Sequence, residues 1–144
     1  MATNLVHMGT PADNRVETLA ATYGSGVPVL SLAGIPAVTL TGSGDYTKSE
    51  AIAGYGTLSG IPAGGVGLSG KEVTLAFNGT FEFDKDAWAS NTLPTTGISQ
   101  GAKVYITGGG DLTTTVGSNT LFGYFDYPKD YDTTRGFLPV RIGA

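Results

Sequence analysis

Residues 72–83, EVTLAFNGTFEF, carry the strongest secondary-structure pattern in the chain. The apolar residues of this stretch fall on odd positions, at Val73, Leu75, Phe77, Phe81 and Phe83. Alternation with a period of two is typical of a β-strand with one buried face. A two-residue hairpin turn at Asn78-Gly79 would place apolar residues opposite polar ones, although this dipeptide is common in such turns. The pattern therefore predicts one straight strand, with a bend or bulge at Gly79.

The residues just before this strand resemble a phosphate-binding loop. Gly65, Gly70 and Lys71 have the spacing G-x-x-x-x-G-K, but Glu72 stands where a Ser or Thr would contact magnesium. Such a loop needs a buried strand before it and a helix after it, and here a strand pattern follows. Because the chain contains 23 glycines in 144 residues, a chance match arises easily. We predict a surface loop that leads into the strand, and no nucleotide binding.

Short β-prone segments separated by turn residues make up most of the remaining chain. Besides residues 72–83, the expected strands are residues 3–8, 15–20, 27–32, 35–41, 102–107, 111–116, 119–127 and 136–142. Residues 84–90 are expected to form one short helix. Strands that recur about every ten residues without alternating helices are typical of a small barrel or sandwich. The sequence thus predicts an all-β fold, a small β-barrel or sandwich, as a single domain over residues 1–144.

Residues 42–71 interrupt this series of strands. They are rich in glycine and show no alternation of apolar and polar residues. Thr47 or Ser49 is placed to cap one helical turn, which Gly54 and Gly56 would end. We interpret the segment as a long glycine-rich insertion, an ordered excursion or a mobile loop.

Composition argues against several classes of function. The chain has no cysteine, which excludes disulfides and thiolate metal sites. Its formal net charge is −4 and its 8 basic residues are scattered, which argues against binding to a nucleic-acid duplex. No apolar run approaches the ~20 residues of a membrane-spanning helix. The N-terminus lacks the basic and apolar regions of a signal peptide, so we expect no secretion.

The candidate reactive groups form no persuasive catalytic or metal-binding set. His7 is the only histidine and lies at the extreme N-terminus, where a hydrolytic triad would have to recruit it. Asp126, Asp130 and Asp132 supply oxygens of the kind that calcium prefers, but without the spacing of a known calcium loop. We interpret them as a solvated loop. The sequence therefore predicts no enzymatic activity, no cofactor and no metal.

A group of aromatic residues allows two interpretations. It consists of Trp88, Tyr105, Phe122, Tyr124, Phe125 and Tyr127. Exposed aromatic side chains form stacking platforms for sugars or single-stranded nucleic acid. In so acidic a chain, a place in the core or in a subunit interface is the better expectation.

Four short patterns resemble a family of tailed-phage capsid decoration proteins, also called cement or head-stabilising proteins. The patterns of that family are G-E-x-V-x-V-x-x-x-G-x-F-E, G-x-x-V-Y, N-x-L-x-G and V-R-I/L, and they correspond here to residues 70–82, 101–105, 119–123 and 140–142. Members are sometimes labelled as a domain of unknown function or as predicted RecA-like recombinases. Family members usually connect the strands before and after residues 42–71 by a much shorter segment, so the insertion is this chain's main departure.

The resemblance implies a trimeric β domain that binds the major capsid protein on the outside of a phage head. The protein would be made in the host cytoplasm and would stabilise contacts between capsid subunits after the head has expanded. Within an N-terminal arm, residues 1–14, we expect the capsid contacts to be Thr3, Asn4, Leu5, Val6, His7 and Met8. Two other functions stay open at this point: a carbohydrate- or receptor-binding module of a virion surface, and a nucleotide hydrolase.

Overall fold

The computed structural model describes residues 5–8, 14–43, 47–52, 56–62 and 71–143. Over these residues the chain forms 12 β-strands and short 3-10 turns, with no α-helix. The strands make three separate sheets, and all pairings between named strands are antiparallel. The prediction of an all-β fold is confirmed.

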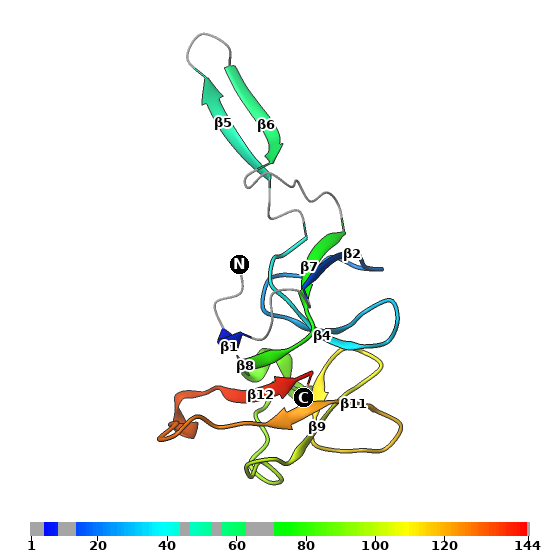
Figure 1. Cartoon of the computed structure of the whole chain (residues 1–144), viewed down its shortest axis with the longest axis vertical. Helices are drawn as coiled ribbons and strands as arrows, with labels where there is room; N and C mark the ends of the chain where they lie inside the picture. Colours follow the sequence, from blue (N-terminus) through cyan, green and yellow to red (C-terminus); the bar gives the residue numbers. More distant parts are fainter. Residues whose placement is uncertain (1–4, 9–13, 44–46, 53–55, 63–70, 144) are drawn as a thin grey trace.

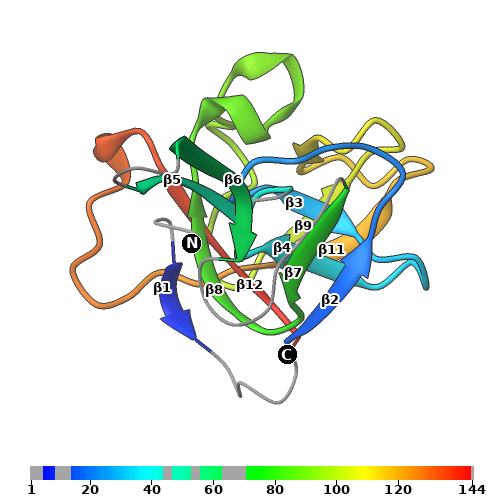
Figure 2. The same cartoon turned by 90° about the horizontal axis from the view of Figure 1, so that it is seen from above.

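The largest sheet has six strands. Their spatial order is β1 (Leu5–Met8), β8 (Gly79–Phe83), β12 (Leu138–Ile142), β11 (Thr120–Phe125), β9 (Lys103–Ile106) and β10 (Leu112–Thr113). β1 lies on the outside of β8 and forms one edge of this sheet (Figure 2). All but β8 fall within segments that alternation or β-propensity predicted as separate strands.

The second sheet has four strands. Their order is β2 (Arg15–Thr18), β7 (Glu72–Ala76), β4 (Pro36–Thr39) and β3 (Pro28–Leu30). β2 and β3 are therefore its two edge strands. Pro28 and Pro36 lie at the first positions of their strands, where a missing N–H is tolerated.

The stretch that gave the clearest pattern forms two strands in two sheets. β7 ends at Ala76 in the four-stranded sheet, and β8 begins at Gly79 in the six-stranded one. Gly79 has a φ of 118°, a backbone conformation that residues with a side chain rarely adopt. The predicted bend at Gly79 is confirmed, and so is the rejection of a hairpin, because β7 and β8 do not pair with each other. The prediction of one straight strand was wrong.

This bend sends the two halves of the alternating pattern into different cores. Val73 and Leu75 belong to a small cluster on one face of the four-stranded sheet. Phe81 and Phe83 belong to a larger cluster that joins the two sheets. The alternation in residues 72–83 indicates only that each half of the stretch has a buried face. It does not indicate which of the two cores that face joins.

The larger core lies between the two sheets. Its buried members are Val38, Leu40, Ala76, Phe81, Phe83, Trp88, Val104, Ile106, Leu112, Phe122, Phe125, Leu138, Val140 and Ile142. The smaller core consists of Leu19, Val29, Ala37, Val73 and Leu75, with Tyr23, Val27 and Phe77 packed against it. The four-stranded sheet therefore buries apolar residues on both of its faces.

The glycine-rich insertion contains a β-hairpin. β5 (Thr47–Ile52) and β6 (Gly56–Pro62) pair only with each other and form the third sheet. Figure 1 shows this hairpin extending away from the two larger sheets. The expectation of one helical turn here was wrong. Cross-strand pairing overrides the weak local signals of so many glycines, because the two strands satisfy each other's backbone groups.

The strands on either side of the insertion are neighbours. The Leu40 N–H donates to the Thr74 carbonyl at 2.8 Å, and the Thr74 N–H donates to the Thr41 hydroxyl at 3.1 Å. Since β4 and β7 run antiparallel, the chain leaves and re-enters the sheet at adjacent points. The insertion thus occupies the connection of what would otherwise be a simple β4–β7 hairpin.

The segment after β8 holds two short turns instead of a helix. η2 (Lys85–Ala87) begins after Asp84, whose carboxylate accepts a hydrogen bond from the Asp86 N–H at 3.0 Å. η3 (Ala89–Asn91) follows it. Between them Trp88 is extended and 2% exposed, because its side chain enters the larger core. That extended residue breaks the helix that the sequence predicted.

Candidate assembly surfaces

Residues 5–8 of the N-terminal arm form an edge strand of the six-stranded sheet. Leu5, His7 and Met8 of β1 are in register with Phe81, Thr80 and Gly79 of β8. One side of β1 therefore pairs with β8, and among the described residues no strand pairs with its other side, which is an open edge. An open edge carries unpaired N–H and C=O groups that can pair with a strand of another protein. Thr3 and Asn4, also predicted as contacts, lie outside the described residues.

A tightly hydrogen-bonded turn joins β3 to β4. The Ser31 N–H donates to the Ile35 carbonyl at 2.9 Å, and the Ile35 N–H donates to the Ser31 hydroxyl at 3.1 Å. The Gly34 N–H donates to the Ser31 carbonyl at 2.8 Å, and Gly34 has a φ of 76°. We call residues 31–35 the Leu32 turn. Its backbone is fixed, yet its side chains Leu32 and Ile35 are 72% and 46% exposed.

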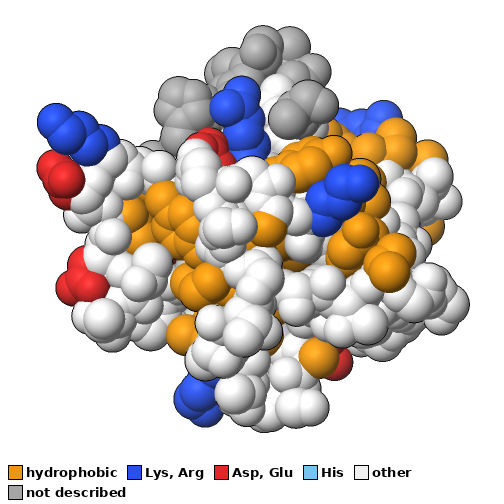
Figure 3. Space-filling view, turned by 90° about the horizontal axis from the view of Figure 1, so that it is seen from below, with side chains coloured by type: hydrophobic (Ala, Val, Ile, Leu, Met, Phe, Trp, Pro, Cys, Tyr) orange, Lys and Arg blue, Asp and Glu red, His pale blue; other side chains and the backbone are white. Residues whose placement is uncertain are grey.

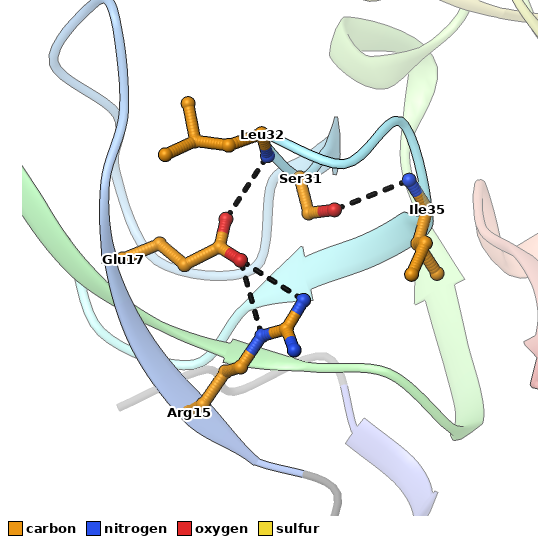
Figure 4. A network of polar contacts seen from close by, with 5 residues as sticks. All are labelled: Arg15, Glu17, Ser31, Leu32 and Ile35. Carbon is orange, nitrogen blue, oxygen red and sulfur yellow. Dashed lines mark hydrogen bonds and ion pairs between the residues drawn. The ribbon is translucent and has the colours of Figure 1, made fainter.

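Glu17 of β2 holds the Leu32 turn in place through a hydrogen bond to its backbone. Its carboxylate accepts the Leu32 N–H at 3.1 Å and the Arg15 Nε at 3.0 Å, as Figure 4 shows. The Glu17 side chain is 12% exposed and the Arg15 side chain is 52% exposed. The solvent-facing member of this ion pair is therefore the cation. The Arg15 guanidinium also lies 4.4 Å from the centre of the Phe77 ring.

A groove runs beside β3. One hollow of about 290 Å³ and another of about 390 Å³ share Val27, Pro28, Asp86 and Ala87 among their lining residues. We call the two together the β3 groove. Its lining mixes apolar residues with glycines and polar groups, and the charged residues in it are all acidic: Glu82, Asp84, Asp86 and Asp111.

The outer face of the six-stranded sheet carries a row of basic and aromatic residues. Arg141, Tyr124 and Lys103 are in register on the neighbouring strands β12, β11 and β9. Figure 3 shows one face of the molecule, on which apolar patches and single basic groups are both exposed. Asp126 lies 3.8 Å from Arg141 and also accepts hydrogen bonds from Thr80 and Gln100.

Most of the aromatic residues that the sequence analysis singled out are packed in or against the larger core. Trp88, Phe122 and Phe125 are at most 2% exposed. Trp88 stacks on Phe125 with ring centres 5.8 Å apart, and Phe125 stacks on Tyr127 at 6.0 Å. Tyr105 and Tyr124 are half-buried on the sheet's outer face. Because the largest rings are already covered, a sugar-stacking platform has little support, and the expectation of core positions is confirmed for these three.

The catalytic and metal-binding candidates do not converge among the described residues. Asp132 caps the turn η4 (Thr133–Arg135) by accepting the Thr134 N–H at 2.9 Å. This hydrogen bond, together with one from the Thr134 hydroxyl, lowers the pKa of Asp132. The described part of the chain contains no cluster of three or more side chains that would hold a metal. His7 lies far from the aspartates in sequence, but on β1 it is in register with Thr80, whose hydroxyl donates to Asp126 at 3.2 Å.

Two loop motifs lack the structure that their chemistry requires. Lys71 is followed by β7 instead of a helix, and its Nζ donates to the Ala20 carbonyl at 3.0 Å. Residues 63–70, the rest of the phosphate-loop pattern, lie outside the described residues. Residues 97–101, GISQG, match the G-x-S-x-G pattern of hydrolases. They lie in a loop that leads into β9, without the strand-to-helix turn that exposes a nucleophilic serine.

Sequence reasoning missed the Leu32 turn and the β3 groove. Two predicted strands, residues 27–32 and 35–41, leave only residues 33 and 34 between them, and the apolar residues Leu32 and Ile35 on either side were the available signal. The groove had no sequence signal, because its walls come from four segments far apart in the chain. No helix in the described residues is long and apolar enough to span a membrane.

The chain matches a known protein family. The family model described as "Phage cement protein" matches residues 32–142, most of the chain. No curated protein and no solved structure matches. The match begins within the Leu32 turn and continues through both larger sheets to the end of β12. The chain therefore belongs to the phage cement protein family.

Proposed function

We propose that this protein binds the outer surface of an expanded tailed-phage head and stabilises contacts between major capsid protein subunits. The family match over residues 32–142 is the observation that carries the proposal. Such a function is mechanical and requires fitted surfaces and exposed strand edges instead of reactive groups. Accordingly, we propose that the protein is not an enzyme.

The open edge of β1 supports a role for the N-terminal arm in binding the shell. In the part of the chain that the structure describes, β1 pairs with β8 on one side and with no strand on the other, so a strand of a capsid subunit can pair there. Strand addition of this kind supplies backbone hydrogen bonds without requiring a particular side-chain chemistry. We propose that residues 3–8 form this contact.

Binding to heads that lack the protein tests the proposed function. Purified protein is mixed with expanded heads and with unexpanded precursor heads, and the bound fraction is measured by co-sedimentation. We expect saturable binding to expanded heads and little binding to precursors. Heads carrying the protein should also retain their DNA to a higher temperature than bare heads. Equal absence of binding to both kinds of head would contradict the proposal.

Removal of residues 2–10 tests the arm. We expect occupancy on expanded heads to fall at least tenfold, because the shell loses its backbone partner in β1. Removal of residues 2–4 alone, which keeps β1, separates the strand from the residues before it. A thermal melt of both variants is the control, since loss of β1 also shortens the six-stranded sheet. Undiminished occupancy of a folded 2–10 deletion would disprove the role of the arm.

A further inference from the structure

The Leu32 turn is an apolar projection whose shape is set in advance. A leucine side chain that is 72% exposed leaves apolar surface in water. The hydrogen bonds within the turn, and the one from the Leu32 N–H to Glu17, hold its backbone before any partner arrives. A rigid projection loses little conformational freedom on binding, so it is well suited to enter a pocket.

The same chain carries a hollow with complementary properties. The β3 groove offers apolar walls from Val27, Pro28 and Ala87, and each of its two hollows is large enough for a leucine side chain. Asp84 and Asp86 line the groove, whereas the cation Arg15 lies beside Leu32 through their shared partner Glu17. The projection is apolar and lies beside the more exposed, cationic member of the Arg15–Glu17 ion pair. The groove combines apolar walls with an acidic rim, in which Asp86 is paired with Lys85.

We propose that the Leu32 turn of one copy inserts into the β3 groove of a second copy. The two surfaces differ, so the contact is head-to-tail, and a head-to-tail contact closes into a ring when the rotation between copies permits it. A three-membered ring is the assembly that the proposed decoration function implies, and the inference rests on that function. A single inserted turn buries less than the roughly 800 Å² per partner of a stable interface. We therefore expect weak association in solution and stronger association where the shell holds copies side by side.

Disulfide trapping tests the contact directly, because the chain has no cysteine of its own. Two single variants, Leu32→Cys and Ala87→Cys, are purified, mixed and oxidised, both in solution and bound to heads. Ala87 lines both hollows of the groove, so its thiol faces the inserted turn. We expect a covalent dimer that contains one copy of each variant, and little dimer from either variant alone. A double variant should give a covalent trimer, since the ring closes, and reducing agent should return it to monomers.

A matched pair controls for random collision. Val116 is 59% exposed and lies outside both the turn and the groove. A mixture of Val116→Cys and Ala87→Cys should give much less covalent dimer than the Leu32 pair. Equal yields from the two mixtures, in solution and on heads, would overturn the proposal. So would efficient linkage of Leu32→Cys to itself, because that result requires like surfaces to meet.

A substitution at the turn gives an independent measurement. Leu32→Asp leaves the backbone hydrogen bonds of the turn in place and should weaken self-association about tenfold or more, as measured by sedimentation. Val116→Asp should leave it unchanged. If trapping fails while the protein still binds heads, the copy-to-copy contact is wrong and the decoration function stands. If trapping succeeds while heads are not bound, the decoration function is wrong and the contact stands.

Discussion

Gly123 shows how a single residue can limit the spacing between two strands. A Cβ atom at this position would lie 2.2 Å from the backbone oxygen of Arg141 on β12. The register also shifts between Leu121 and Gly123, so the strand is irregular at this point. Gly123 is the last residue of the N-x-L-x-G pattern by which the family resemblance was noticed. The pattern therefore marks a close approach of two backbones.

Gly123→Ala should destabilise the protein by about 3 kcal/mol, because β11 has to move away from β12 to admit the methyl group. Chemical denaturation monitored by Trp88 fluorescence measures the change in free energy of unfolding. Gly108→Ala is the control, since a Cβ there meets nothing within 4 Å. A loss at Gly123 no larger than the loss at Gly108 would show that the strands can separate without cost.

Tyr131 makes the free energy of unfolding depend on pH in the alkaline range. Its hydroxyl donates to the Glu82 carboxylate at 2.8 Å, and Arg135 lies 3.7 Å from the same carboxylate. Burial and then the hydrogen bond to Glu82 raise the pKa of Tyr131 above its ordinary value of 10.0. The unfolded chain therefore loses the phenol proton at a lower pH than the folded protein does. The stabilising contribution is complete below pH 10.0 and declines as pH rises above it.

Tyr131→Phe should make the free energy of unfolding less sensitive to pH in the range of roughly pH 10 to 12. Below that range the variant should be less stable than the parent by about 1 kcal/mol, because the hydrogen bond to Glu82 is lost. Denaturation at a series of pH values measures both effects. Burial also raises the pKa of Tyr127, so some pH dependence should remain in the variant. An identical slope in the two proteins would contradict the role of Tyr131.

The positions of the strands could be predicted from the sequence more readily than the strands with which they pair. Alternation located β7 and β8 because the backbone places successive side chains on opposite faces regardless of which sheet receives them. The change of sheet between Ala76 and Gly79 depends on contacts with β2 and β12, which lie far away in sequence. The β5–β6 hairpin was not predicted, because its strands show no alternation of apolar and polar residues, although their pairing is local. The local sequence pattern thus predicts that a strand has a buried face, but it does not predict which sheet or core that face joins.

Replacement of residues 44–70 by a short glycine-containing turn should leave the two larger sheets folded. β5 and β6 pair only with each other, and the hydrogen bonds of Leu40 and Thr74 already bring the ends of the gap together. We expect the far-ultraviolet circular dichroism of a β protein and a melting temperature within a few degrees of the parent. A cooperative transition that disappears in this variant would show that the insertion is part of the domain's folding unit.

At the scale of the whole molecule, composition and strand spacing predicted the class of fold, and four short patterns predicted the family. The candidate assembly surfaces were harder to predict from the sequence. The edge position of β1 among the described strands follows from its pairing with β8, and the β3 groove exists only where four segments meet. Neither leaves a signature in any one stretch of sequence. The N-terminal arm was predicted as a contact from its position and β-propensity, and that assignment stays a prediction.

Titration calorimetry with ATP and magnesium should give no heat of binding. Lys71 leads into a strand, so the helix whose N-terminal amides would receive the phosphates is missing from the described structure. A Lys71→Ala variant titrated in parallel controls for weak electrostatic association. A saturable heat that Lys71→Ala abolishes would restore the phosphate-loop interpretation.

The position of the insertion has a practical consequence. The chain leaves the four-stranded sheet after β4 and returns at β7, and the two strand ends are neighbours. A foreign folded module whose own termini lie close together can be spliced between them with little strain on the host sheet. On a phage head covered by this protein, the same junction would display many copies of that module at fixed spacing. The chain would then serve as a scaffold for multivalent vaccines or arrayed enzymes.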